Sequence, residues 1–362
     1  MRRFLVVLVG LMVLATTGLA GAQQVSAAQQ ISLPEAVALA LQEDIGHQIA
    51  LVQWDNAKVA YERSLADNLL TGSAYNARLA EYTLKQADTE YRGKVADVVV
   101  ETVTQFADLA QADLTLQIRE KELALAKKQL ELTRQKRATQ NASELDVLEA
   151  ESALATAEAN YQQANDNLAQ ARRNFQFLLG GHRALPDGNL PFVPLTVDLD
   201  DLLQRAIAES VTVKQAEENV ELVSLDLEQL ELEQAAPLVL REARNKVKLA
   251  QLQLAQAKER ITNEVTSAYN SVNQAARRYR SAQQSLELET RTFAITKQQL
   301  EAGLKTADEL DRAQIALWQA TSAELSARKD YVLAYLAFER SLDRDLSASV
   351  LVQPPAEVTP ED

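Results

Sequence analysis

The chain has no cysteine and only two histidines, ten glycines and eight prolines among its 362 residues. Without cysteine it cannot form a disulfide framework, a thiol nucleophile, an iron–sulfur site or a lipid-modified cysteine. Two histidines are too few for a histidine-rich metal site, and we expect neither metal nor cofactor. The formal net charge of −14 argues against binding to nucleic acid. Scarce glycine and proline indicate few turns and long secondary-structure elements.

The N-terminus has the three parts of a secretory signal peptide. Arg2 and Arg3 form a basic start, residues 4–14 are apolar, and Ala20-Gly21-Ala22 is a small-residue cleavage site. We therefore predict a signal peptide over residues 1–22, with a retained N-terminal anchor as the alternative. No other stretch approaches the ~20 apolar residues of a membrane span. The mature protein is expected to be exported, and the lack of cysteine suits an oxidising compartment.

The remaining glycines and prolines divide the chain into a few long segments. Three glycines and three prolines gather between residues 180 and 194, which predicts a linker over residues 180–198. Three further prolines lie near the acidic C-terminus, so residues 346–362 are predicted to form a disordered acidic tail.

The segments between these breaks have helical patterns. Leucine recurs every seven residues from Leu109 to Leu130, among residues that favour helices. Ala77–Ala138 and Leu240–Ala302 contain no proline, and ~60 residues at ~1.5 Å each give rods of roughly 90 Å. Helices of this length need lateral partners, and the seven-residue spacing indicates coiled-coil packing. The predicted fold class is all-α, with long antiparallel coiled-coil helices.

The two halves of the chain repeat each other. A displacement of 166 residues places Leu33 on Leu199, and a displacement of 165 places Glu144-Leu145-Asp146 on Glu309-Leu310-Asp311. Helix-capping pairs recur in both halves: Ser32 with Glu35, Asp198 with Asp201, Asn141 with Glu144, and Thr306 with Glu309. We predict two repeats, residues 31–179 and 199–345. Each consists of a short helix, a medium helix, a turn, a long helix, a second turn and a return helix.

This organisation resembles the TolC-type outer-membrane efflux proteins, which are duplicated, signal-bearing chains. The segment 31–40 (ISLPEAVALA) is similar to the start of that family, and Phe177-Leu178-Leu179-Gly180 is similar to the end of its first half. Segments 299–313 and 135–150 are similar to the turns at the periplasmic tip. The resemblance implies a protomer of a trimeric α-helical barrel, located at the outer membrane or in the periplasm. The implied partners are a periplasmic adaptor protein and an inner-membrane pump.

One expected feature of the family is missing. Its members carry a pair of membrane-crossing β-strands between the medium and long helices of each half. Here those places hold only Leu69–Tyr75 and Gln234–Leu238, which are too short to span a bilayer. We therefore expect a divergent member without evident membrane β-strands. Its association with the membrane is expected to come through the assembly rather than through a transmembrane helix.

The resemblance also suggests site residues. Asp308 and Asp311 lie one turn apart where the family has acidic residues around the pore entrance, and three chains would bring six carboxylates together. The alternative is that both are ordinary first-turn acids of a helix. The predicted adaptor contacts lie in the two tip turns, and they are Ala302, Gly303, Leu304, Arg137 and Ala138. The alternative for Gly303 is a plain helix cap.

No pattern of residues indicates catalysis. The sequence has no glycine-rich phosphate loop, no Ser/His/Asp order and no metal-ligand spacing, so we expect no catalytic, cofactor-binding or metal residues and no enzyme. The predicted function is the passive helical conduit of a tripartite or type I export system. The alternative is a coiled-coil structural or scaffolding protein of the cell envelope that forms no channel.

Overall fold

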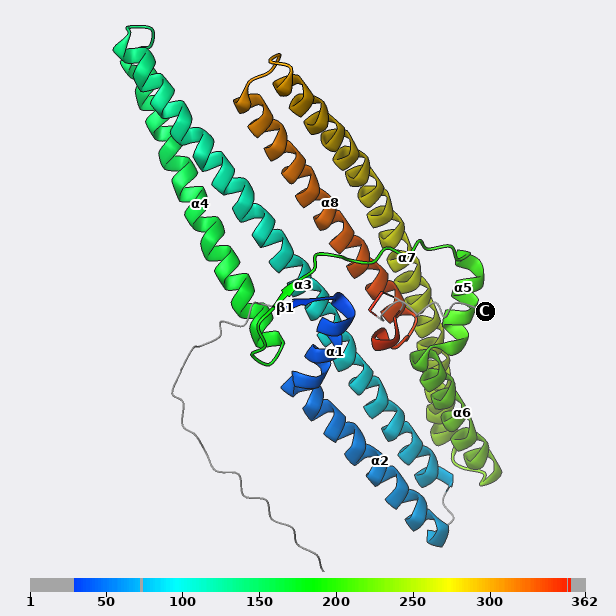
Figure 1. Cartoon of the computed structure of the whole chain (residues 1–362). Helices are drawn as coiled ribbons and strands as arrows, with labels where there is room; N and C mark the ends of the chain where they lie inside the picture. The colour runs from blue at the N-terminus through cyan, green and yellow to red at the C-terminus, as the bar shows by residue number, and fades with distance from the viewer. Residues whose placement is uncertain (1–28, 72–73, 350, 353–362) are drawn as a thin grey trace, which may run out of the picture.

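Long antiparallel helices dominate the computed structural model, which describes residues 29–71, 74–349 and 351–352 (Figure 1). The helices of the first repeat are α1 (Leu33–Glu43), α2 (Ile45–Thr71), α3 (Ala74–Ala138) and α4 (Glu144–Leu178). Those of the second are α5 (Leu199–Glu209), α6 (Val211–Leu232), α7 (Pro237–Glu301) and α8 (Ala307–Ser341). The predicted all-α fold is thus confirmed. The predicted signal peptide, residues 1–22, lies outside the described residues.

The two repeats match helix for helix. α1 and α5 have 11 residues each, α3 and α7 have 65, and α4 and α8 have 35. The first two helices of the second repeat, α5 and α6, start 166 residues after their counterparts α1 and α2, as predicted. For example, α1 starts at residue 33 and α5 at residue 199. The long helix α7 and the return helix α8 each start 163 residues after their counterparts α3 and α4, rather than the predicted 165. The long helices start at residues 74 and 237, and the return helices start at residues 144 and 307. The displacement falls by three residues because α6, with 22 residues, is five shorter than α2, with 27. Part of this difference is offset, since α7 starts five residues after the end of α6 whereas α3 starts three residues after the end of α2.

The long helices form a row in the upper part of Figure 1. α3 packs against α4 on one side and α8 on the other, and α8 in turn packs against α7. The order across the row is therefore α4, α3, α8, α7, with α4 and α7 at its two edges. The opposite end of the molecule consists of the hairpins α2–α3 and α6–α7. In the part of the chain that the structure describes, no helix combines the length and apolar character that a bilayer crossing requires.

The main hydrophobic core lies around the middle of the long helices, where the short helices α1 and α5 pack on α3 and α7. Phe106 of α3 and Phe175 of α4 meet edge to face, with ring centroids 6.2 Å apart. Leu336 of α8 is fully buried in the same core. Nearer the turn between α3 and α4, a separate small cluster joins Leu130 and Val147. Most of the apolar packing therefore lies in the middle of the molecule, and the helical hairpins that extend from it have small apolar contacts by comparison.

The predicted linker, residues 180–198, joins the two repeats and packs against the long helices. It contains β2 (Ala184–Pro186), which pairs in parallel with β1 (Gln29–Ile31), and it then crosses α3 and α8 toward α5 (Figure 1). The ring centroid of Phe192 lies 4.8 Å from that of Tyr279 and 4.5 Å from that of Tyr331. The Tyr331 hydroxyl donates to the Val193 carbonyl, and burial raises the pKa of Tyr331 to about 12.

The C-terminal segment is more ordered than the predicted tail. Residues 346–348 form a short 3₁₀ helix, η1 (Leu346–Ala348), and Leu346, Leu351 and Val352 are buried in the main core. The prediction of disorder from residue 346 is therefore wrong for residues 346–349 and 351–352, because these apolar side chains pack against α3 and α8. Residues 353–362 lie outside the described residues.

Candidate functional site

The turns between α3 and α4 and between α7 and α8 form the two tips of the molecule, and both lie at the same end (Figure 1). Each turn leaves its helix through a residue with left-handed backbone geometry, Gln140 with φ 59° and Gly303 with φ 73°. In both turns the amide of the next residue donates to the carbonyl five residues earlier, at 2.8 Å. This geometry is that of a Schellman cap. The two tips are therefore structural counterparts.

A capping box starts the return helix at each tip. The Thr306 amide donates to the Glu309 carboxylate at 2.9 Å, and the Glu309 amide donates to the Thr306 hydroxyl at 3.3 Å, as predicted. In the first repeat the cap is Ser143 with Asp146, whose carboxylate accepts from the Ser143 amide at 2.7 Å. The predicted pair Asn141 with Glu144 is therefore wrong, because α4 starts two residues later than that pairing requires.

The capping carboxylates are held in their charged form. Hydrogen bonds from the Ser143 amide and hydroxyl lower the pKa of Asp146. The Lys305 ammonium and then the Thr306 amide lower the pKa of Glu309 from 4.5 to about 2. Both charges lie at helix N-termini, where the helix dipole favours a negative charge.

The predicted adaptor-contact residues all lie exposed at the two tips. Gly303 and Leu304 lie in the α7–α8 turn, and the Leu304 side chain is 76% exposed. Ala302 caps the C-terminus of α7 beside them, and Arg137 and Ala138 are the last two residues of α3 at the other tip. The Arg137 guanidinium lies 3.3 Å from the Glu144 carboxylate at the start of α4, so it forms an ion pair within its own tip.

The structure places Asp308 and Asp311 on α8 where it faces α3. Asp311 lies 2.7 Å from the Lys121 ammonium, and Asp308 forms an ion pair with Lys128. The hydrogen bond from Lys128 to Asp308 raises the pKa of that lysine. Two lysines of the same chain therefore compensate the two carboxylates that the sequence suggested for a pore entrance. The lysines were not identified from the sequence, although they lie seven residues apart, on one face of a coiled-coil helix.

These ion pairs begin a line of polar contacts along the seam between α3 and α8. Farther from the tips the contacts are a hydrogen bond from Gln111 to Ser322 and two ion pairs, Lys329 with Asp108 at 2.9 Å and Arg340 with Asp97 at 3.0 Å. In each successive contact the residue number falls on α3 and rises on α8, as an antiparallel pair requires. The seam joins the two repeats, and near the tips charged side chains line it.

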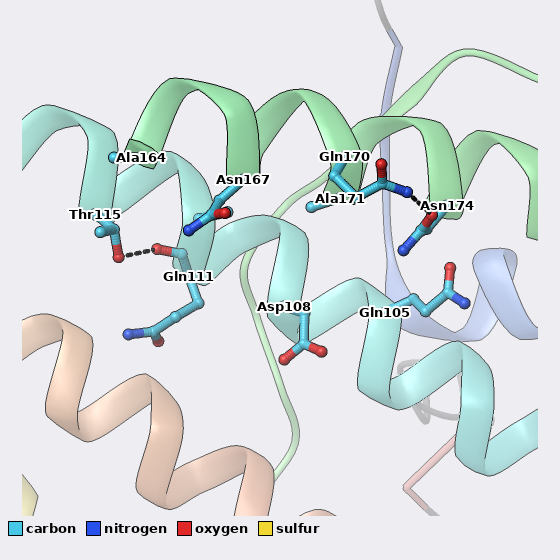
Figure 2. A pocket seen from close by; sticks show the side chains of 10 residues that line it. Gln105, Asp108, Gln111, Thr115, Ala164, Asn167, Gln170, Ala171 and Asn174 are labelled. Atoms are coloured by element: carbon cyan, nitrogen blue, oxygen red, sulfur yellow. Dashed lines mark hydrogen bonds between the residues drawn. The ribbon is translucent and has the colours of Figure 1, made fainter. Parts of the chain in front are cut away.

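A polar hollow of about 410 Å³ lies between α3 and α4 (Figure 2). Figure 2 shows α4 above α3 with amide side chains between them, and Gln170 donates to Asn174 at 2.6 Å. The carbonyl oxygens of the Gln105 and Gln111 side chains are buried there without a protein hydrogen-bond partner. Asp108, the only ionisable residue of the hollow, is paired with Lys329. The hollow offers polar contacts but no acid–base pair.

No group of three or more His, Cys, Asp or Glu side chains that could hold a metal ion occurs among residues 29–71, 74–349 and 351–352. The charged side chains of the tips and of the seam serve instead as caps and ion pairs.

Comparisons with known proteins agree with this architecture. The family model for outer membrane efflux proteins matches residues 64–181, from the end of α2 to just beyond α4. The fold is similar to the outer membrane protein VceC of Vibrio cholerae, with a TM-score of 0.56 at 13% identity over 86% of this chain and 95% of that one. The CmeC outer membrane channel of Campylobacter jejuni also has a TM-score of 0.56, at 12% identity over 91% of this chain and 93% of that one.

A membrane protein from Pseudomonas aeruginosa is similar to the same degree, with a TM-score of 0.56 at 16% identity over 86% of this chain and 93% of that one. No curated protein sequence matches the chain. The resemblance to the outer-membrane efflux proteins is therefore confirmed, in sequence over residues 64–181 and in fold over most of the chain.

Proposed function

We propose that the chain is one protomer of an efflux channel of the cell envelope, exported and associated with the outer membrane or the periplasm. Three copies would close their rows of helices into a hollow conduit, which substrate crosses without chemical change. The observation that carries this proposal is the row α4–α3–α8–α7, which ends in two matched tips at one end. Proteins with this fold include outer membrane channels.

The conduit would be passive. The tips and the seam hold caps and ion pairs rather than reacting groups, so we assign the chain no enzymatic role. The energy for transport would come from an inner-membrane pump, in a tripartite or type I export system. Opening would separate α8 from α3 at the tips, where Asp308 and Asp311 face their lysines, and would leave the apolar core in place. A partner that binds the separated tips more tightly would shift the equilibrium toward the open form.

The partner at the tips would be a periplasmic adaptor. Ala302, Gly303, Leu304, Arg137 and Ala138 form the exposed surface available to it. Leu304 is the largest apolar side chain of this set, and its 76% exposure leaves an apolar contact open to a partner.

Export of a fluorescent dye by cells that depend on this protein tests the proposal. Leu304→Glu is expected to reduce export severalfold while leaving the helical content unchanged, because a charge replaces the apolar contact. Leu238→Glu is the matched control, since Leu238 is 74% exposed at the opposite end of the molecule. Equal export by both variants and the unaltered protein would contradict the assignment of the tips to the adaptor.

A coiled-coil scaffold of the envelope is the second candidate, favoured by the absence of reacting groups at the seam and in the polar hollow. A scaffold needs no adaptor. Removing the protein would then alter cell shape or envelope integrity and leave dye export unchanged. Loss of export with normal cell shape favours the conduit.

A further inference from the structure

The polar hollow between α3 and α4 contains hydrogen-bonding groups that the fold leaves unused (Figure 2). The side-chain carbonyl oxygens of Gln105 and Gln111 are buried there and have no partner among the described residues. The orientation of the Gln105 amide is fixed, because its nitrogen donates to the Glu101 carboxylate, which can only accept. Buried carbonyl oxygens in proteins are nearly always hydrogen-bonded, so this hollow suits a ligand that offers donors.

The duplication indicates that the fold does not require these amides. The pair α7 and α8 is the counterpart of the pair α3 and α4, at a displacement of 163 residues. Three amide residues that line the hollow are replaced there by alanine or leucine: Gln105 by Ala268, Gln170 by Leu333, and Asn174 by Ala337. The second repeat therefore forms the same helix pair with apolar side chains at these places. We infer that the amides of the first repeat serve a purpose other than packing.

The charged side chains around the hollow balance one another. Three acidic and three basic residues gather there, either as ion pairs or on the amides of the hollow: Asp108 with Lys329, Asp113 with Arg172, Glu101 on Gln105, and Arg173 on Gln170. Three charges of each sign leave no net charge to attract a cation or an anion. The ligand that fits best is therefore uncharged.

The hollow lies on the side of the helix row that faces away from the main core. On α3 the Phe106 side chain is buried in that core, whereas Asp108 of the hollow comes two residues later, about 200° around the helix. The short helices α1 and α5, the linker and η1 all contribute side chains to the core, so they cover the other side of the row (Figure 1). A ring of rows has more room for these elements outside than inside. In the proposed conduit, the hollow would therefore face the lumen.

We propose that this hollow binds a sugar, an uncharged ligand rich in hydroxyl groups, within the lumen of the conduit. Its place in the lumen rests on the proposed function, whereas sugar binding itself does not. Each hydroxyl group both donates and accepts. Sugar hydroxyls would donate to the carbonyl oxygens of Gln105 and Gln111 and accept from the amide nitrogens of Asn167 and Asn174, whose oxygens already accept from glutamines of α4. The volume of about 410 Å³ lies within the range of roughly 300–1,000 Å³ typical of small-molecule sites.

Saturation-transfer NMR with maltose as the probe tests the site on the purified mature protein. The variant that combines Gln105→Ala, Gln170→Leu and Asn174→Ala introduces the residues of the second repeat, so it is expected to keep its helical content. Its affinity for maltose should fall at least about tenfold, because three hydrogen-bonding amides are lost. Gln162→Leu is the matched control on α4, since Gln162 donates to Asp166 and does not line the hollow. It should bind maltose as the unaltered protein does.

Equal maltose affinity in the triple variant and the unaltered protein would overturn the site and leave the proposed function standing. If the triple variant loses helical content, Gln170→Leu alone gives the same comparison with Gln162→Leu. Binding of the polycation spermidine in place of maltose would overturn the ligand class. Maltose binding by single chains that disappears when they assemble would overturn the location in the lumen. A protein that binds maltose at the hollow but exports no dye would overturn the proposed function and leave the sugar site standing.

Discussion

Phe175 and Phe177 lie two residues apart on α4 and are expected to respond to alanine in different assays. The side chain of Phe175 is 1% exposed and packs edge to face on Phe106. Removing a phenylalanine that buries roughly 150–200 Å², at about 25 cal/mol per Å², costs about 4–5 kcal/mol. This value agrees with the 3–5 kcal/mol typical of such core substitutions, to which the residual cavity contributes. Phe175→Ala should therefore lower the free energy of unfolding by about 4 kcal/mol.

The side chain of Phe177 is 87% exposed, so Phe177→Ala should change the unfolding free energy of a single chain by no more than about 0.5 kcal/mol. In the proposed conduit the rows of neighbouring copies meet at their edges. Since α4 lies at the edge of its row, the Phe177 side chain becomes covered by a neighbouring copy. Losing that contact is expected to weaken association by about 1.5–3 kcal/mol, which is roughly 10- to 100-fold in the dissociation constant.

Two measurements separate these effects. Urea unfolding followed by circular dichroism, at a concentration where single chains dominate, reports the stability of the fold. Analytical ultracentrifugation over a range of concentrations reports association. The reasoning is refuted if Phe177→Ala destabilises the single chain as much as Phe175→Ala does. It is also refuted if Phe177→Ala leaves association unchanged.

Two further predictions concern backbone strain and pH. At Gly180, with φ 62°, a Cβ atom would lie 2.6 Å from the Glu43 carboxylate and 2.9 Å from the Glu43 Cβ. Gly180→Ala should therefore lower the melting temperature more than Gly181→Ala, because at Gly181 φ is 96° but no atom lies within 4 Å of an added Cβ. Equal shifts in melting temperature would show that the contact between residue 180 and Glu43 is absent. The pKa of Glu309, about 2, lies below its usual 4.5, so its capping contribution is present above pH 4.5 and fades as the pH falls toward 2. A carbon NMR titration should give a pKa near 2 for the Glu309 carboxyl, and Lys305→Met should raise that pKa toward 4.5. A pKa near 4.5 in the unaltered protein would contradict the ion pair between Lys305 and Glu309.

The helices could be predicted closely because their signals are local. The sequence placed the long helices within a few residues of α3 and α7, since proline and glycine are rare and helix-favouring residues fill the intervals. The duplication was also visible, because N-cap residues recur at matching places, with Ser32 before α1 and Asp198 before α5. The second displacement was misjudged by two residues. A Glu-Leu-Asp tripeptide occurs in both halves, but the capping hydroxyls of Ser143 and Thr306 set the true register.

Contacts between distant segments were not predictable in the same way. The linker and the C-terminus have the composition of loops, yet Phe192 packs on Tyr331, and Leu351 is buried in the core. Likewise, nothing near Asp308 in the sequence identifies Lys128, which is 180 residues away, as its partner. These contacts depend on which helices become neighbours, and only the assembled row brings α8 beside α3.

The central claim is that copies of this chain close into a hollow helical conduit. Electron microscopy of the purified mature protein, at a concentration where it associates, tests that claim most directly. The account predicts rings with a central opening in end view and long hollow cylinders in side view. Solitary rods, or filaments without a central opening, would contradict it.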